Sequence, residues 1–437
     1  MRSICIIRGR KEKPKLKYNN RDDMKRIIIV LLTIFPMTAL GWHEVKVPNV
    51  KSLQVSVNGE WTKLPVMELG SNDVLSVSFD ELSHTYHRFA VHMEHCEFDW
   101  TTSEGLFESD WLQGFNDWQI DDYMNSLNTN VLYTNYTFQI PNDMCTLKMS
   151  GNYRLHIIDE DCDNEEIACV ELRVVEPIVT LGMGISTNTD IDMNRSHQQV
   201  TLGMRLNGLS VTNNEEQVKT IVMQNGYEGD MRSEVAPNII TMNEMRWEHR
   251  RDLIFDAGNE YHRYEVLDPT HITLGLEKVY WDEDECRFHV YPDQCEPQRN
   301  YLYYRDADGA FLIRNSNNVE NDRISEYVYV HYKFAPVREY SDATVFVDGR
   351  WATEDSSTYV MTYDAKDRSY NATILQKLGY YNYRIMLSDS DGRVMRLPEE
   401  GNFYQTENRY EAFVYYKETG GRTWRLVGYK EVSFQAQ

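Results

Sequence analysis

The sequence lacks an excess of positive charge. Its 45 Lys and Arg residues are outnumbered by 68 Asp and Glu residues, which gives a formal net charge of −23 at pH 7. A nucleic-acid-binding protein needs a basic face that releases phosphate counterions. The charge balance therefore argues against a nucleic-acid partner and favours basic or neutral ones.

Sequence signatures of hydrolytic enzymes are also lacking. The chain contains no Gly-x-Ser-x-Gly and no His-Glu-x-x-His pattern. Carboxylate pairs are frequent, but in so acidic a chain they do not identify a glycosidase. We therefore expect a protein that is not an enzyme and that needs no cofactor.

Metal-ligand patterns are weak. No Cys-x-x-Cys spacing is present, and His92 and His95 would point to opposite faces of a strand. The acidic run from Asp159 to Asp163 lacks the twelve-residue loop of a calcium site and is typical of a solvated hairpin tip. We therefore predict no metal site.

Long apolar runs are lacking apart from Ile27 to Leu40, whose fourteen residues are too few to span a bilayer. Met24-Lys25-Arg26 precedes this run, and the small residues Ala39 and Gly41 close it. This is the pattern of a signal peptide over residues 24–41. We expect residues 1–23 to be an upstream mis-start, and the exported chain to have no membrane span.

Six cysteines follow the signal peptide, an even number that permits disulfides in an exported protein. Cys162 with Cys169, and Cys286 with Cys295, flank polar turns and are the predicted local pairs. Cys96 lies inside a predicted strand, where we expect a buried thiol.

The residues that are abundant favour strands. Aromatic residues make up 12% of the chain, including 29 Tyr, and Val, Ile and Thr are frequent. The segment from Tyr86 to Trp100 is predicted to form a core strand. Residues 128–143 and 150–158 are predicted to form further core strands of the same antiparallel sheet. Leu53 to Val57 and Trp61 to Val66 flank Asn58-Gly59, a strong hairpin signal.

The length of 437 residues accommodates two to four domains. We predict an all-β fold of tandem β-sandwich domains. The first covers residues 42–177 and ends at Pro177, and a second β-rich domain covers residues 178–336. Residues 337–437 have regularly spaced strands with Asp-Gly and Gly-Gly turns, which predicts an immunoglobulin-like domain.

Two aromatic features are candidates for binding. Trp111, Phe115 and Trp118 lie in an irregular stretch, which is either a lid over the first sheet or a partner-contact surface. The third region is similar to glycogen-binding, early-set modules, in which a tryptophan near the position of Trp351 stacks on sugar. An exported carbohydrate-binding or surface-glycan protein is therefore the alternative function.

Several ordered motifs together resemble one family, the type IX secretion system plug proteins. The motifs are HCEFDW (95–100), NTNVLYTNYTFQIPND (128–143), SGNYRLHI (150–157), VELRVVE (170–176), SHQQV (196–200), QNG (224–226), AGNEYHRYE (257–265) and LGYYNYRI (378–385). The resemblance implies a non-enzymatic periplasmic protein whose partner is the large outer-membrane β-barrel translocon. It also implies that the protein seals the periplasmic opening of that barrel when cargo is absent.

The motif residues are expected to determine the fold rather than to contact a partner. They are His95, Cys96, Asp99, Trp100, Asn128, Thr129, Tyr133, Tyr136, Pro141, Asn142, Ser150, Gly151, Asn152, Tyr153, Gly258, Asn259 and Glu260.

Overall fold

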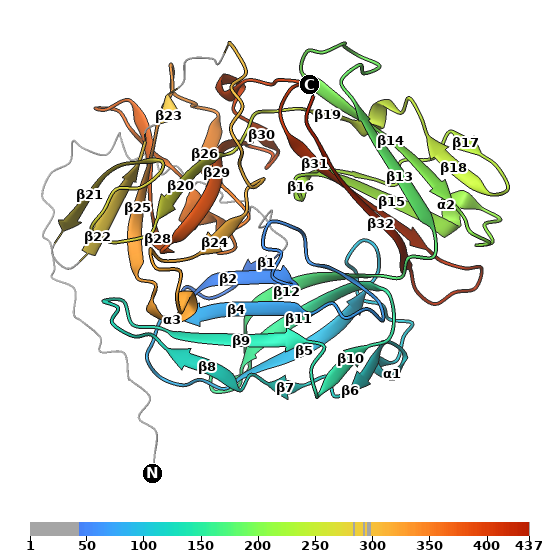
Figure 1. Ribbon diagram of the computed structural model, residues 1–437, viewed down its shortest axis with the longest axis horizontal. Helices are drawn as coiled ribbons and strands as arrows, with labels where there is room; N and C mark the ends of the chain where they lie inside the picture. The colour runs from blue at the N-terminus through green and yellow to red at the C-terminus, as the bar shows by residue number, and fades with distance from the viewer. Residues whose placement is uncertain (1–42, 283–284, 292, 295–298, 437) are drawn as a thin grey trace, which may run out of the picture. The chain divides into compact units, whose positions relative to one another are not determined.

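A computed structural model describes residues 43–282, 285–291, 293–294 and 299–436 of the chain (Figure 1). The predicted mis-start and signal peptide lie outside these residues. The described chain is mostly β, as the sequence predicts, and its strands form several mainly antiparallel sheets. No helix in the described ranges is long and apolar enough to cross a membrane. The helices found there are α1 Glu108–Trp111, α2 Asn214–Gln217, α3 Asn321–Ile324, η1 Arg251–Leu253, η2 Ser356–Tyr359 and η3 Pro398–Glu400.

The first part of the chain forms two sheets that share one hydrophobic cluster, which includes Phe79, Val91 and Leu155. Sheet 1 has the order β1-β12-β11-β5-β7, with β3 parallel to β12, and sheet 2 has the order β2-β4-β9-β8. The strands of sheet 1 are β1 His43–Val45, β3 Val66–Glu68, β5 Phe89–Cys96, β7 Trp118–Gln119, β11 Gly151–Asp159 and β12 Glu165–Val175. Those of sheet 2 are β2 Val50–Val57, β4 Leu75–Glu81, β8 Asp122–Asn125 and β9 Thr134–Ile140. A separate ribbon pairs β6 Leu112–Gly114 with β10 Cys145–Leu147.

The hairpin predicted at Asn58-Gly59 is wrong in its second strand. Asn58 and Gly59 do form a turn with positive φ angles of 53° and 74°. However, β2 pairs with β4, and only Val66 of the segment from Trp61 to Val66 is in a strand. The side chain of Asn58 accepts a hydrogen bond from the Val74 amide at 3.0 Å, so the turn is tied to the more distant strand.

The middle and the end of the chain share a sheet. Sheet 3 has the order β13-β14-β18-β17, with β19 beside β14, and sheet 4 has the order β16-β15-β31-β32. The strands of sheet 3 are β13 Thr180–Ser186, β14 His197–Arg205, β17 Ile239–Ile240, β18 Glu244–Trp247 and β19 Ile254–Asp256. Those of sheet 4 are β15 Val218–Gln224, β16 Tyr227–Ser233, β31 Asn408–Tyr416 and β32 Arg425–Phe434. In Figure 1 the red strand β31 runs beside β15, and β32 follows on its other side.

The remaining strands form two further sheets that share a second large hydrophobic cluster. In sheet 5, β29 pairs with its four other strands, and sheet 6 has the order β21-β22-β25-β28-β27, with β23 beside β25. The strands of sheet 5 are β20 His262–Val266, β24 Phe311–Ile313, β26 Ala343–Asp348, β29 Gly379–Asp389 and β30 Val394–Arg396. Those of sheet 6 are β21 Leu276–Asp282, β22 Glu285–Val290, β23 Asp293–Gln294, β25 Tyr327–Ala335, β27 Thr362–Asp364 and β28 Ser369–Lys377. Strand pairs therefore cross the boundary predicted at residues 336 and 337, both between β25 and β28 and between β15 and β31.

A buried ion pair joins sheet 2 to sheet 6. The ammonium of Lys377, at the end of β28, lies 2.6 Å from Oδ2 of Asp80 in β4, and both side chains are 1% exposed. Tyr327 donates a hydrogen bond to the same oxygen at 2.6 Å, and Asn135 donates to Oδ1 at 2.8 Å. The Lys377 ammonium also lies 4.2 Å from the centroid of the Tyr133 ring. Such complete pairing is what makes a charge tolerable away from water.

Replacing Lys377 by Met should strongly destabilise the protein, because Asp80 would then be buried without its cation. We expect Lys377→Met to lower the free energy of unfolding by about 3–5 kcal/mol, measured by urea denaturation. Adding Asp80→Asn should restore part of the loss, since the amide carries no charge. Lys366→Met, at an exposed position, is the control and should change stability by less than about 0.5 kcal/mol. Equal effects at Lys377 and Lys366 would contradict the assignment.

Candidate functional site

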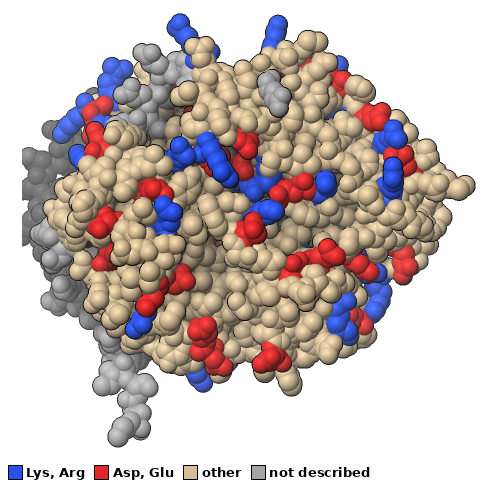
Figure 2. Space-filling view, viewed as in Figure 1, with Lys and Arg blue, Asp and Glu red and all other residues tan. Residues whose placement is uncertain are grey.

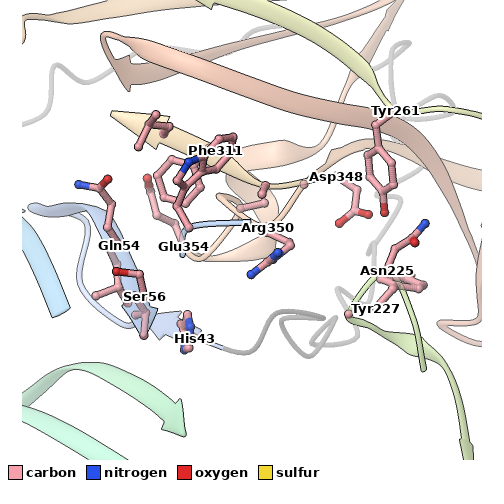
Figure 3. Close-up of a pocket in the computed structure, with 18 of the residues that line it drawn as sticks. His43, Gln54, Ser56, Asn225, Tyr227, Tyr261, Phe311, Asp348, Arg350 and Glu354 are labelled. Atoms are coloured by element: carbon pink, nitrogen blue, oxygen red, sulfur yellow. The ribbon is translucent and has the colours of Figure 1, made fainter. Parts of the chain in front are cut away.

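A cavity with a volume of about 300 Å³ lies where several sheets meet (Figure 3). Its wall is built from β2, the loop after β2, the turn between β15 and β16, β24, β26 and the loop after β26. Figure 3 shows Gln54 and Ser56 on one side, Asn225 and Tyr227 on another, and Arg350 between them. Residues far apart in the sequence thus form one wall.

Arg350 ties the loop after β26 to the loop after β2. Its guanidinium donates hydrogen bonds to the carbonyl oxygens of Thr62 at 2.5 Å and Lys63 at 2.7 Å. Burial, with a smaller effect from the positive charge of Arg409, lowers the pKa of Arg350 to about 10. These neutral partners make Arg350 a connector between loops rather than a catalytic base.

A second arginine joins sheet 5 to sheet 4 at the edge of the cavity. Nε of Arg384 lies 2.8 Å from Oδ2 of Asp348. Its guanidinium carbon lies 4.1 Å from the centroid of the Tyr227 ring, a cation–π arrangement. The charges of Asp348 and Arg384 are therefore used within the fold.

A third arginine is buried between sheet 1 and sheet 4. Arg173 in β12 lies between two aromatic rings, 4.8 Å from the centroid of Trp100 and 4.7 Å from that of Phe413. Its Nε donates to the Tyr415 hydroxyl at 3.3 Å, and that hydroxyl donates to Asn152 at 2.7 Å. Polar side chains again connect sheets whose strands are distant in the sequence.

The carboxyl groups of Glu260 and Glu411 are also buried. Glu260 is 3% exposed and accepts hydrogen bonds from the Tyr301 hydroxyl and, at 3.1 Å, from the Glu407 amide. Burial raises its pKa to about 7, against the lowering effect of these two bonds. Burial likewise raises the pKa of Glu411 to about 8, although Arg409 lies 3.4 Å away. These groups hold protons at mildly acidic pH.

Many motif residues lie inside the first part of the chain. His95 is buried, with Nδ1 2.9 Å from the Ser103 hydroxyl, and its ring is edge-on to Tyr153. A Cβ on Gly151, whose φ is 152°, would collide with the His95 ring. Cys96, Ser150 and Asn152 are buried as well.

The other motif residues shape turns and the contact with sheet 6. The side chain of Asp99 accepts a hydrogen bond from the Thr101 amide, and that of Asn142 accepts from the Met144 and Cys145 amides. Two other motif residues, Trp100 and Asn128, have positive φ angles. The peptide bond before Pro141 is cis. Tyr133 donates to the Ser325 carbonyl oxygen, Tyr136 accepts from the His87 amide, and Thr129 is half-buried. Gly258 has a positive φ angle, and Asn259 donates to the Glu400 carbonyl oxygen.

The sequence predicts either a lid over the first sheet or a partner-contact surface for the irregular stretch, and its tryptophans pack as a lid would. Trp111 and Trp118 are buried in the hydrophobic cluster of the first two sheets, so neither presents a face to a partner. Phe115, in contrast, is 67% exposed. The two tryptophans therefore pack the irregular stretch against the first two sheets, and Phe115 remains at the surface.

The sugar platform predicted at Trp351 also needs correction. Trp351 is 8% exposed, its indole N–H donates to the Asn382 carbonyl oxygen at 2.7 Å, and its ring is stacked on Tyr332. A sugar needs a free indole face, so this residue does not provide the contact.

The predicted disulfide between Cys162 and Cys169 is wrong, because both are free thiols. Cys162 is exposed in the turn after β11, whereas Cys169 is buried in β12 opposite His156. Cys169 lies four positions after Glu165, the first residue of β12, which corresponds to roughly 13 Å of strand. This separation moves Cys169 away from the turn that holds Cys162, whereas a disulfide needs Cα atoms within about 7 Å. Cys286 is a free thiol in β22, and its predicted partner Cys295 lies outside the described residues.

Sequence reasoning missed the residues that connect the sheets, namely Asp80, Arg173, Lys377, Arg384 and Arg350. Four of them are charged residues inside strands, where alternation places charge on a solvated face. The sequence does contain one indication of such residues, namely a charged residue close to bulky apolar ones. Lys377, between Leu375 and Leu378, is an example.

The buried carboxyl groups predict a stability that falls as pH rises. The folded pKa of Glu260 exceeds its unfolded value of about 4.5, so the folded state keeps a proton that the unfolded chain releases. The free energy of unfolding should therefore fall between about pH 4.5 and pH 7. Glu260→Gln removes the ionisable group and should therefore make the fall in the free energy of unfolding smaller, by at most about 3 kcal/mol. Solvent screening of the carboxyl group would make this difference smaller still.

Thermal midpoints measured from pH 4.5 to pH 8 test the effect of Glu260. Glu418→Gln, at an exposed position, is the matched control and should follow the wild-type profile. An unchanged profile in Glu260→Gln would show that this carboxyl ionises normally.

Comparisons with known proteins identify relatives of the chain. Residues 50–176 match the family described as the type 9 secretion system plug protein 1st domain. A crystal structure of a hypothetical protein from Parabacteroides merdae is 32% identical with a TM-score of 0.86, and the match covers 90% of this chain and 99% of that one. A match to dimeric latent PorU from Porphyromonas gingivalis, 12% identical over 90% of this chain and 34% of that one, has a TM-score of 0.13 and carries no argument. No curated protein matches.

The family match lies in the first two sheets and includes the motifs HCEFDW, NTNVLYTNYTFQIPND and SGNYRLHI. The matching crystal structure extends the likeness over nearly the whole described chain, with the same fold at substantial identity. The chain belongs to the type 9 secretion system plug protein family.

Proposed function

We propose that this protein is a non-enzymatic periplasmic plug for the translocon of the type 9 secretion system. In this proposal it closes the periplasmic opening of the large outer-membrane barrel while no cargo occupies it. The observation that carries the proposal is the family match over residues 50–176. The partner is then the translocon barrel, and the site of action is the periplasmic face of the outer membrane.

The contacts between the sheets support this proposal because a plug must hold its shape. Asp80 with Lys377, Arg173 with Tyr415, and Arg350 with the Thr62 and Lys63 carbonyls each join elements distant in the sequence. Removing one member of a buried ion pair such as Asp80 with Lys377 costs several kcal/mol. Sheets connected in this way resist movement against one another, as occlusion of a wide opening requires.

The surface supports a reversible contact. On the face shown in Figure 2, Lys and Arg side chains lie among Asp and Glu side chains. Interfaces that form and dissociate are of modest area and more polar than permanent ones. Phe115 adds an exposed aromatic side chain, and Phe107, 75% exposed, lies eight residues before it. Exposed aromatic residues with a polar surround are typical of interface centres.

Loss of the protein should make the outer membrane leaky to large solutes. In cells that lack it, we expect increased uptake of a large hydrophilic dye, restored by the wild-type chain, because an open barrel admits solutes that the outer membrane otherwise excludes. A tagged chain should also recover a very large outer-membrane barrel from detergent extracts. An equally tight envelope together with recovery of no barrel would contradict the proposal.

Phe115 should contribute to the contact with the barrel. We expect Phe115→Asp to reduce recovery of the barrel at least about fivefold, because an interface aromatic residue typically contributes 1 kcal/mol or more. Met242→Asp, at a position 91% exposed in the loop before β18, is the matched control and should leave recovery unchanged. Equal recovery by both variants would place the contact elsewhere on the surface.

A further inference from the structure

Side chains that bind metals gather on the outer face of sheet 1, opposite the face that enters the hydrophobic cluster. Leu155 and Val170 point into the cluster, so His156 and Cys169, next to them in the sequence, point the other way. His156 in β11 lies directly opposite Cys169 in β12. Ligand atoms of His156, Glu166 and Cys169 all lie within 4.8 Å of one another.

The spacing of these atoms is close to that of a tetrahedral metal centre. Bonds of about 2.0–2.3 Å place the ligand atoms about 3.3–3.8 Å apart. Nδ1 of His156 is already 2.7 Å from Oε1 of Glu166, so closure requires a small side-chain movement. Cys169 is buried, whereas His156 and Glu166 are partly exposed, so an ion enters from the solvent side.

The other nitrogen of His156 has the partner that metal-binding histidines usually have. Nε2 lies 3.6 Å from Oε2 of Glu94 in β5. When an ion displaces the proton that Nδ1 shares with Glu166, a carboxylate in this position orients the ring through Nε2–H. This contact is independent of the spacing of the three ligand atoms and supports the same assignment.

The surrounding charges are compatible with a bound cation. Lys46 lies 2.7 Å from Oε2 of Glu166 and leaves Oε1 for the ion. Arg154 is paired with Glu171 at 3.4 Å. Metal binding would replace the thiol proton of Cys169 with the ion, so the thiolate becomes the ligand.

We propose that Nδ1 of His156, Oε1 of Glu166 and Sγ of Cys169 bind a divalent ion of the zinc type, with water as the fourth ligand. One imidazole, one thiolate and one carboxylate suit zinc and cobalt better than calcium or magnesium. The ion would fasten β11 to β12 near the tip of their hairpin. This site is independent of the proposed plug function.

Titration of the purified protein with Co²⁺ and Zn²⁺ at pH 7 tests the site. We expect one Co²⁺ per chain, with the thiolate-to-cobalt charge-transfer band and the visible absorption of a tetrahedral site. Cys169→Ser should abolish the charge-transfer band, whereas Cys162→Ser, which removes the exposed thiol seven residues away, should keep it. Zn²⁺ affinity by calorimetry should fall at least tenfold in Cys169→Ser and in His156→Gln.

Two results would overturn the proposal. One is the lack of saturable Zn²⁺ binding to the wild-type protein. The other is Zn²⁺ binding of equal affinity in wild type, Cys169→Ser and His156→Gln, which would mean adventitious surface binding. Circular dichroism checks the fold of each variant. If Cys169→Ser does not fold, Glu166→Gln and His156→Gln decide the question by the same tenfold criterion.

Discussion

The ion pair between Asp80 and Lys377 is the interaction on which the arrangement of the sheets depends most. It lies away from water between sheet 2 and sheet 6, and its remaining hydrogen-bonding capacity is met by Tyr327 and Asn135. A buried pair of this kind adds little net stability compared with an apolar contact. It does, however, allow only one relative placement of the two sheets, because any shift would leave a charge buried alone.

The same principle recurs where other sheets meet. Arg173 lies between Trp100 and Phe413, and Arg384 lies between Asp348 and Tyr227. Apolar clusters supply the cohesion within pairs of sheets, and these polar contacts fix how the pairs are joined. For a protein proposed to act by filling an opening, such specificity of assembly is the property that function requires.

Local features could be predicted from the sequence, but partners distant along the chain could not. The apolar and β-branched segment Val218–Gln224 forms strand β15, yet nothing in its pattern shows that it pairs with β31 near the end of the chain. Alternation specifies which side chains face a core but leaves the neighbouring strand open. For the same reason the cavity around Arg350 could not be predicted, because its wall comes from segments scattered over about 300 residues.

Tryptophan side chains were the second source of wrong predictions, because a tryptophan can either bind a ligand at the surface or pack in the core. Trp111 and Trp118 lie in an irregular stretch that reads as exposed, but burial of their large apolar surface holds that stretch on the core. Trp351 occupies a position where a sugar-binding indole was expected, and it packs inward instead. The motif glycine, asparagine and proline residues of the first part of the chain act through local backbone geometry, which a sequence can indicate without knowledge of distant partners.

The central claim is that the folded chain closes the barrel by occupying it, without chemistry. Electrical conductance of the purified translocon barrel in a planar lipid bilayer, recorded before and after addition of the purified protein, tests this claim most directly. We expect the large conductance of the empty barrel to be lost when the protein is added to the periplasmic side. A conductance that stays unchanged while the protein is bound to the barrel would contradict it.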